Sequence, residues 1–120
     1  MVVLSQQREA GEPEQQAEVP HHHAALALAA QHGQAEVVRV LLETGENPNR
    51  FNPEGHHAHS TPLHQAALVG HLEVVRLLVE RGARLDVEDK IYQATPLGWA
   101  EHGGQKETAE YLRGADAKLE

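Results

Sequence analysis

The sequence contains no cysteine and very few aromatic residues. Without cysteine there can be no disulfide bond and no thiolate-based zinc site. Aromatic residues make up only 3% of the 120 residues. Alanine, leucine and valine must therefore build the core, which suits close packing between helices.

Basic residues and long apolar runs are also scarce. Ten Lys and Arg stand against 18 Asp and Glu, and the formal net charge is −8 with neutral histidines. Such a chain is poorly suited to bind nucleic acid or an anionic membrane. No apolar stretch approaches 18 residues, and the N-terminus lacks the basic-then-apolar pattern of a signal peptide. We expect one cytoplasmic domain with no nucleic-acid partner and no membrane partner.

A repeated pattern is present, centred on residues 61–67, which read T-P-L-H-Q-A-A. Similar segments begin at Ala24 and Thr95, 37 residues before and 34 residues after Thr61. A glycine follows each start after nine residues, at positions 33, 70 and 104, and a further glycine follows in the first two copies, at positions 45 and 82. Constant spacing within copies and variable spacing between them predict helical hairpins with insertions between the hairpins.

The middle copy shows how each hairpin forms. Thr61 is a good N-cap, and Pro62 suits the first helical position, where no amide donor is needed. Gly70 can adopt the left-handed conformation that ends a helix. A second, more apolar helix follows, and we expect its Leu77 and Leu78 to be buried between helical layers.

The outer copies depart from this pattern. The first copy lacks Thr-Pro, and Pro20 is expected to serve as its first helical residue. The third copy has a more polar second helix, which we expect to end near Arg113 and Gly114. Polar end repeats are typical of stacked arrays, because one face of each meets water.

This pattern resembles the ankyrin repeat, whose signature is T-P-L-H-x-A at a period of about 33 residues. The resemblance covers residues 20–115 and implies an all-α solenoid of about three stacked helix-turn-helix repeats, residues 20–50, 51–86 and 87–115, with extended loops between them. Residues 1–19 are expected to form a mobile Gln/Glu-rich tail and residues 116–120 a short C-terminal tail. Segments 51–60 and 95–104 are similar to those of small bacterial ankyrin-repeat proteins, which favours a bacterial source.

The resemblance also implies a protein-binding function, through the inter-repeat loops and the exposed side of the first helices. We expect a monomer that binds another protein, whose identity the sequence does not give. The residue pairs before the turn glycines, 31–32, 68–69 and 101–102, would lie on this face, with apolar and aromatic residues of the loops beside them. The candidate partner-binding residues are Leu68, Val69, Tyr92, Ile91, Phe51, His32 and His102. For Leu68, Phe51 and Ile91 the alternative is packing against neighbouring loops.

Catalytic motifs are missing from the sequence. It has no Gly-x-Ser-x-Gly elbow, no glycine-rich phosphate loop and no His-Glu-x-x-His. Asp86, Glu88 and Asp89 are expected to be solvated in the turn after the second helix of the middle repeat. We therefore expect no enzyme activity, no catalytic residues and no cofactor.

The most unusual feature of the composition is its ten histidines. The family motif gives His64 a structural role, and we expect the same of His71. Clusters occur at residues 21–23 and at His56, His57 and His59, and imidazoles suit several transition metals. We expect no metal site, because histidine groups without a motif rarely provide both ligand geometry and supporting contacts. A histidine-based metal or pH-responsive binding protein is the alternative function, and a regulatory segment of a larger enzyme is another.

Trp99 is the only tryptophan. We expect it to pack over the terminal repeat, where its indole N–H would need a hydrogen-bond acceptor.

Overall fold

The computed structural model describes residues 20–118, which form six helices and no strand. The helices are α1 (Pro20–Gln31), α2 (Ala35–Glu43), α3 (Pro62–Val69), α4 (Leu72–Glu80), α5 (Pro96–His102) and α6 (Lys106–Lys118). They pair as three hairpins, α1 with α2, α3 with α4 and α5 with α6. The predicted all-α solenoid of three helix-turn-helix repeats is confirmed, and α1 begins at Pro20 as expected.

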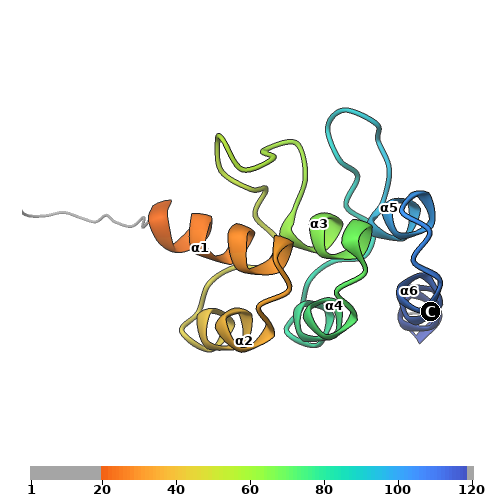
Figure 1. Cartoon of the computed structure of the whole chain (residues 1–120), viewed down its shortest axis with the longest axis horizontal. Coiled ribbons are helices and arrows are strands. Elements are labelled where there is room, and N and C mark those ends of the chain that lie inside the picture. The colour runs from red at the N-terminus through yellow and green to blue at the C-terminus, as the bar shows by residue number, and fades with distance from the viewer. Residues whose placement is uncertain (1–19, 119–120) are drawn as a thin grey trace, which may run out of the picture.

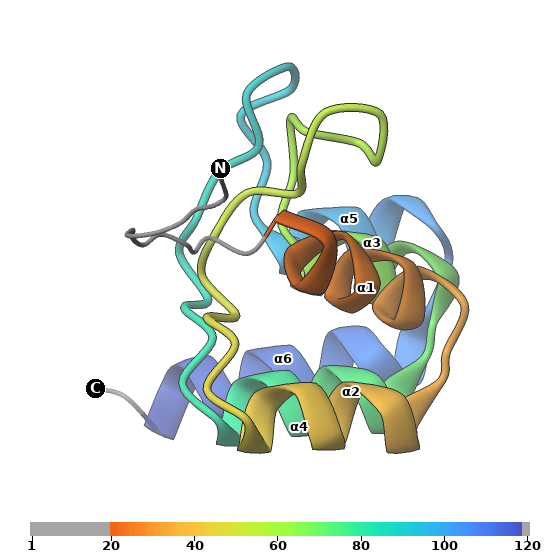
Figure 2. The same cartoon turned by 90° about the vertical axis from the view of Figure 1, so that its left-hand side faces the viewer.

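The hairpins stack side by side to give two layers of helices. Helices α1, α3 and α5 form one layer, and α2, α4 and α6 form the other (Figure 1). Two long loops project beyond the α1–α3–α5 layer, as the view along the stack shows (Figure 2). We name them the first finger (residues 44–61) and the second finger (residues 81–95).

The N-terminus of α3 is capped as the sequence predicted. The Thr61 hydroxyl accepts a hydrogen bond from the amide of His64, at 3.4 Å. In return, Nδ1 of His64 accepts from the amide of Thr61, at 3.2 Å. Two amides that the helix leaves without partners are thus satisfied by one reciprocal pair. Gly70 ends α3 with φ of 83°, a left-handed conformation that glycine adopts without strain.

Small residues allow the helices of the first layer to approach closely. Five alanines at the contacts of α1, α3 and α5 are buried, namely Ala29, Ala30, Ala66, Ala67 and Ala100. Leu78 is also fully buried, as predicted. Leu77 is only half-buried, so that prediction was wrong. Its repeat counterpart Val40 is 46% exposed, because this position lies on the flank of the outer helix layer.

The two ends of the stack differ in polarity. The same repeat position is occupied by Val37, Val74 and Thr108, which are 44%, 0% and 2% exposed. Val37 is the most exposed of the three because no described repeat packs before the first one. At the other end, Arg113 pairs with Glu101 at 3.1 Å. The first repeat therefore ends in an apolar surface and the third in a polar one.

Helix α6 runs to Lys118, so the expected end near Arg113 and Gly114 was wrong. Gly114 lies within the helix, and the good helix formers Ala115 and Ala117 follow it. The expected C-terminal tail, residues 116–120, is therefore helical as far as Lys118. The predicted N-terminal tail, residues 1–19, lies outside the described residues.

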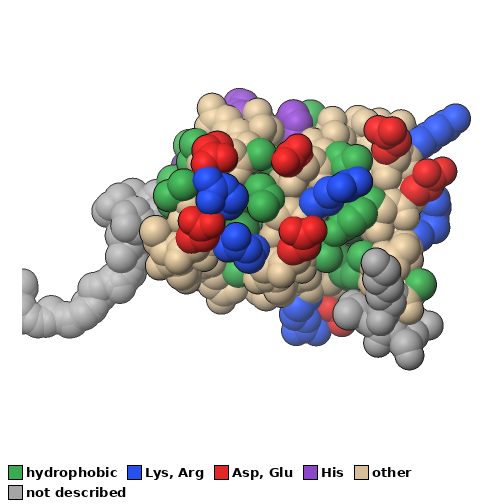
Figure 3. Space-filling model, turned by 90° about the horizontal axis from the view of Figure 1, so that it is seen from below, with side chains coloured by type: hydrophobic (Ala, Val, Ile, Leu, Met, Phe, Trp, Pro, Cys, Tyr) green, Lys and Arg blue, Asp and Glu red, His purple; other side chains and the backbone are tan. Residues whose placement is uncertain are grey.

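The outer face of α2, α4 and α6 carries intermixed charges. Acidic and basic side chains alternate there with apolar ones (Figure 3). Arg39 pairs with Glu43 at 2.8 Å, and Arg81 reaches the same carboxylate from the end of α4, at 3.5 Å. Exposed pairs of this kind contribute little stability. None of the helices in residues 20–118 has the length and apolar character needed to cross a membrane.

Candidate protein-binding face

The two fingers point in the same direction and are tied to each other at several points (Figure 1). The amide of Lys90 donates to the carbonyl of His59 at 2.8 Å. Nearer the outer helix layer, Oδ1 of Asn49 accepts from the amide of Arg84 at 2.7 Å, and its Nδ2 donates to the carbonyl of Gly82 at 3.0 Å. The fingers therefore form one connected wall above the first helix layer.

Buried histidines hold the base of each finger. Nδ1 of His64 accepts from an amide, so the ring proton is on Nε2, which donates to the carbonyl of Ala94 at 2.9 Å. In the first repeat His23 makes a similar contact from a different helix position, where its Nε2 bonds the carbonyl of Phe51. Burial lowers the pKa of His64, although the bond to Ala94 opposes this effect, and the ring is neutral near pH 7. The predicted structural role of His64 is confirmed. His23, from the cluster at residues 21–23, is 3% exposed and also has a structural role.

Asp89 organises the second finger, and the expectation that it is solvated was wrong. Its carboxylate accepts hydrogen bonds from the amides of Ile91, Tyr92 and Ala94, at 2.9, 2.6 and 3.0 Å. Its Oδ2 also accepts from the indole N–H of Trp99 at 2.8 Å. Burial alone would raise the pKa of Asp89, but these four hydrogen bonds outweigh it and hold the pKa well below its usual range.

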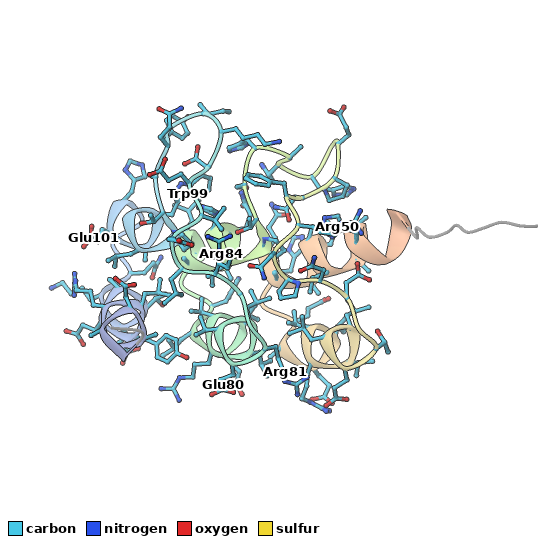
Figure 4. The ribbon with its side chains drawn as sticks, turned by 180° about the vertical axis from the view of Figure 1, so that it is seen from behind. Arg50, Glu80, Arg81, Arg84, Trp99 and Glu101 are labelled. Atoms are coloured by element: carbon cyan, nitrogen blue, oxygen red, sulfur yellow. The ribbon has the colours of Figure 1, made fainter. Side chains whose placement is uncertain are left out.

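Trp99 therefore has the acceptor that the sequence required. The ring lies where α5 meets the second finger (Figure 4) and is 8% exposed. It also contacts the ring of His64, with centroids 5.2 Å apart. Because Asp89 accepts from the indole N–H and His64 packs against the ring, the Trp99 side chain is held in one orientation on this face.

Side chains at the start of α4 and α6 join each of these repeats to the previous one. Nε2 of His71 bonds the carbonyl of Gln31 at 3.1 Å, which confirms its predicted structural role. One repeat later, Nε2 of Gln105 donates to the carbonyl of Leu68 at 3.2 Å. Sequence reasoning did not identify Gln105, although its place immediately after Gly104 matches that of His71 after Gly70.

A pocket of about 680 Å³ opens between the fingers and the first helix layer. Its wall is mainly apolar, with both fingers, α3 and α5 contributing to it. The lining residues are His57, His59, Gln65, Leu68, Tyr92, Ala94, Gly98, Trp99 and His102. Three predicted partner-binding residues, Leu68, Tyr92 and His102, meet here although they are far apart in the sequence.

The other predicted residues lie outside this pocket. Ile91 and Val69 are 57% and 46% exposed, and His32 is exposed. Phe51 is half-buried beneath the ammonium group of Lys90, which lies 4.5 Å from the ring centroid. Phe51 therefore packs against the neighbouring finger, which is the alternative that the sequence left open.

Two expectations about this face need correction. Leu68, which the sequence placed on the exposed side of the first helices, is half-buried, because Gly103 of the next repeat packs against its carbonyl and side chain. In the observed register, His102 is the counterpart of Leu68 and Gln31, so the pair at 101–102 is shifted by one residue from the pairs at 31–32 and 68–69. Tyr92, at 71% exposed, fits its prediction.

The histidines of the first finger do not form a compact cluster. His57 is exposed, and its ring centroid lies 6.3 Å from that of His59. His59 turns instead toward Trp99, with centroids 5.7 Å apart, and His56 is half-buried. Within residues 20–118, no group of three His, Asp or Glu side chains is arranged to hold a metal ion.

Comparison with known proteins places this geometry in a family. The ankyrin repeats family, in three copies, matches residues 26–120. Cyclin-dependent kinase 4 inhibitor B of Bos taurus is 35% identical over 117 residues, which covers 73% of this chain and 88% of the relative. The Mus musculus protein of the same name is 35% identical over 121 residues, with 77% and 92% covered. Cyclin-dependent kinase inhibitor 2A of Homo sapiens is 34% identical over 119 residues, with 75% and 76% covered.

These relatives are mammalian, so the comparisons do not support the expected bacterial source. The three helical hairpins agree with the three copies of the family match. The chain belongs to the ankyrin-repeat family and is a protein–protein interaction module.

Proposed function

We propose that this chain binds a protein kinase of the cyclin-dependent class through the finger face. By finger face we mean the two fingers together with the pocket between them and the ends of α1, α3 and α5. The names of the relatives motivate the choice of partner, because they describe inhibitors of cyclin-dependent kinases. The pocket that joins both fingers to α3 and α5 is the observation that favours this face.

Physical reasoning supports the finger face over the outer helices. The fingers carry the most exposed large apolar residues, Tyr92 and Ile91, on a loop that Asp89 and His64 hold in place. A rigid loop loses little entropy when it binds, so exposed aromatic residues on it are efficient contacts. The outer helices instead present intermixed exposed ion pairs.

On this proposal the chain binds its partner and catalyses no reaction. It acts as a monomer in the cytoplasm by occupying a surface of the kinase. The predicted contacts Leu68, Val69, Tyr92, Ile91, His32 and His102 belong to this proposal, with Phe51 in a supporting position beneath Lys90.

Calorimetric titration of purified human cyclin-dependent kinase 4 with the chain tests this proposal. A variant with Ile91→Ala and Tyr92→Ala should bind about tenfold more weakly or worse, because truncation of central aromatic contacts typically costs more than 1 kcal/mol. The matched control carries Val37→Ser and Val40→Ser, which alter two exposed apolar side chains of α2, and it should bind like the wild type. Absence of binding would refute the kinase assignment, and equal binding by both variants would refute the finger face.

A further inference from the structure

The pocket between the fingers has a lining that specifies its occupant. Its base is formed by Leu68 and Trp99, and Tyr92 stands at its mouth. The indole cannot turn away, because its N–H is bonded to Asp89 at 2.8 Å. The volume of about 680 Å³ lies within the usual range for ligand pockets. A fixed apolar base of this size suits a bulky aromatic or branched aliphatic side chain.

Histidines supply most of the polar side chains of the pocket, and carboxylates supply none. No Asp or Glu lines it, although the chain has 18 acidic residues. Three of the ten histidines do line it, His57, His59 and His102. The rings of His57 and His102 each carry an N–H group that can donate to a ligand in the pocket. An acidic group of a ligand can accept hydrogen bonds from these N–H donors, whereas a basic group would meet no carboxylate in the lining.

Gly98 leaves part of the wall open. A Cβ at this position would lie 3.5 Å from Cβ of Ala94 and 3.8 Å from Oγ1 of Thr95, which are ordinary contacts. Packing therefore does not require glycine here, and a larger side chain would occupy pocket space. This provides a graded pair of variants, since Gly98→Ala leaves most of the volume and Gly98→Leu fills it.

We propose that this pocket receives a bulky apolar side chain from a partner segment, with an Asp or Glu of that segment within two residues accepting a hydrogen bond from His57 or His102. The inference rests on the proposed function, because it describes the segment that the finger face recognises. It predicts an apolar–acidic signature in the partner, whichever protein carries it.

Selection from a random 12-residue peptide library displayed on phage tests the signature. The chain serves as bait, and a parallel selection on the Gly98→Leu variant gives the background. Peptides enriched on the chain should share Phe, Leu or Ile within two residues of Asp or Glu. Enrichment of basic peptides, or no enrichment over the Gly98→Leu variant, would overturn the proposal.

Titrations with one enriched peptide that lacks tryptophan then test the geometry. Trp99 is the only tryptophan of the chain and lines the pocket, so its fluorescence reports occupancy directly. Gly98→Leu should raise Kd about tenfold, a loss of ~1.4 kcal/mol, while Gly98→Ala should change Kd less than about threefold. Because Gly98→Leu could also disturb the fold, its melting curve is recorded, and Tyr92→Ala at the exposed mouth should give a similar loss without affecting folding.

The acidic contact has its own readout in a double-mutant cycle. When the peptide's Asp or Glu is changed to the amide, its binding to the wild-type chain should weaken about fivefold. Its binding to a variant with His57→Ala and His102→Ala should weaken much less. An equal loss in both would contradict the role of the histidines.

If indole-3-acetate binds and no peptide does, the pocket is a small-molecule site and the proposal is wrong. If no peptide binds but the kinase still binds through the fingers, this inference is wrong and the proposed function stands.

Discussion

Trp99 donates its indole N–H to the Asp89 carboxylate at 2.8 Å, which links α5 to the second finger across ten residues. The same carboxylate accepts three backbone amides of that finger. One buried side chain thus fixes both the exposed tip, with Ile91 and Tyr92, and the base of the pocket. The shape of the finger face therefore depends on Asp89.

Replacement of Asp89 should therefore destabilise the protein. Asp89→Ala leaves three amides and an indole without acceptors, which should lower the free energy of unfolding by about 2–4 kcal/mol. Glu88→Ala, at the exposed neighbouring position, should change it by less than about 0.5 kcal/mol. Urea denaturation followed by Trp99 fluorescence measures both, and similar values for the two variants would contradict the role given to Asp89.

The buried, neutral His64 should make stability depend on pH. Its pKa is lowered in the folded state, so the unfolded chain binds a proton more readily once the pH falls below the ordinary value of about 6.5. The stability that this ring contributes should therefore be fully present near pH 7.5 and decline toward pH 5.5. We predict that the destabilisation caused by His64→Gln is largest at pH 7.5 and shrinks as the pH falls. Denaturation curves of both proteins at several pH values measure this difference, and a destabilisation that grew toward pH 5.5 would show that the sign is wrong.

Equivalent valines in two repeats should respond differently to truncation. Val74 is fully buried, whereas Val37 at the open end of the stack is 44% exposed. Val74→Ala should cost about 1–3 kcal/mol, and Val37→Ala less than about 1 kcal/mol. Thermal melts of the two variants provide the comparison. Equal costs would mean that Val37 is covered in solution.

Two glycines should respond oppositely to alanine. A Cβ at Gly103 would lie 2.3 Å from the carbonyl oxygen of Leu68, so Gly103→Ala should force the repeats apart and cost about 1–3 kcal/mol. Gly114 lies within α6 and has open space around it. Gly114→Ala should stabilise the protein by up to about 1 kcal/mol, through helix propensity. Chemical denaturation of both variants checks the signs, and stabilisation by Gly103→Ala would rule out the close approach.

The sequence predicted those parts of the fold that depend on local signals. Thr61 and Pro62 start α3, Gly70 ends it, and the glycine spacing sets the hairpins, all within a few residues of one another. The end of α6 was misjudged for a local reason, since Gly114 was interpreted as a stop although helix formers follow it.

The parts of the candidate site that the sequence did not predict depend on contacts between repeats. Asp89 stands in a polar segment and looked solvated, and only the return of the loop to Trp99 buries it. The sequence did contain a signal, because a tryptophan over a terminal repeat needs an acceptor and an aspartate before a turn often accepts nearby amides. The half-burial of Leu68 follows from the approach of Gly103, which no local pattern of residues 61–70 encodes.

Hydrogen–deuterium exchange of the chain, with and without cyclin-dependent kinase 4, tests the central claim most directly. Kinase binding through the finger face predicts slower exchange in residues 51–60 and 88–95, with α2 and the outer face of α4 unchanged. Protection confined to α2 and α4, with the fingers exchanging as in the free chain, would contradict it.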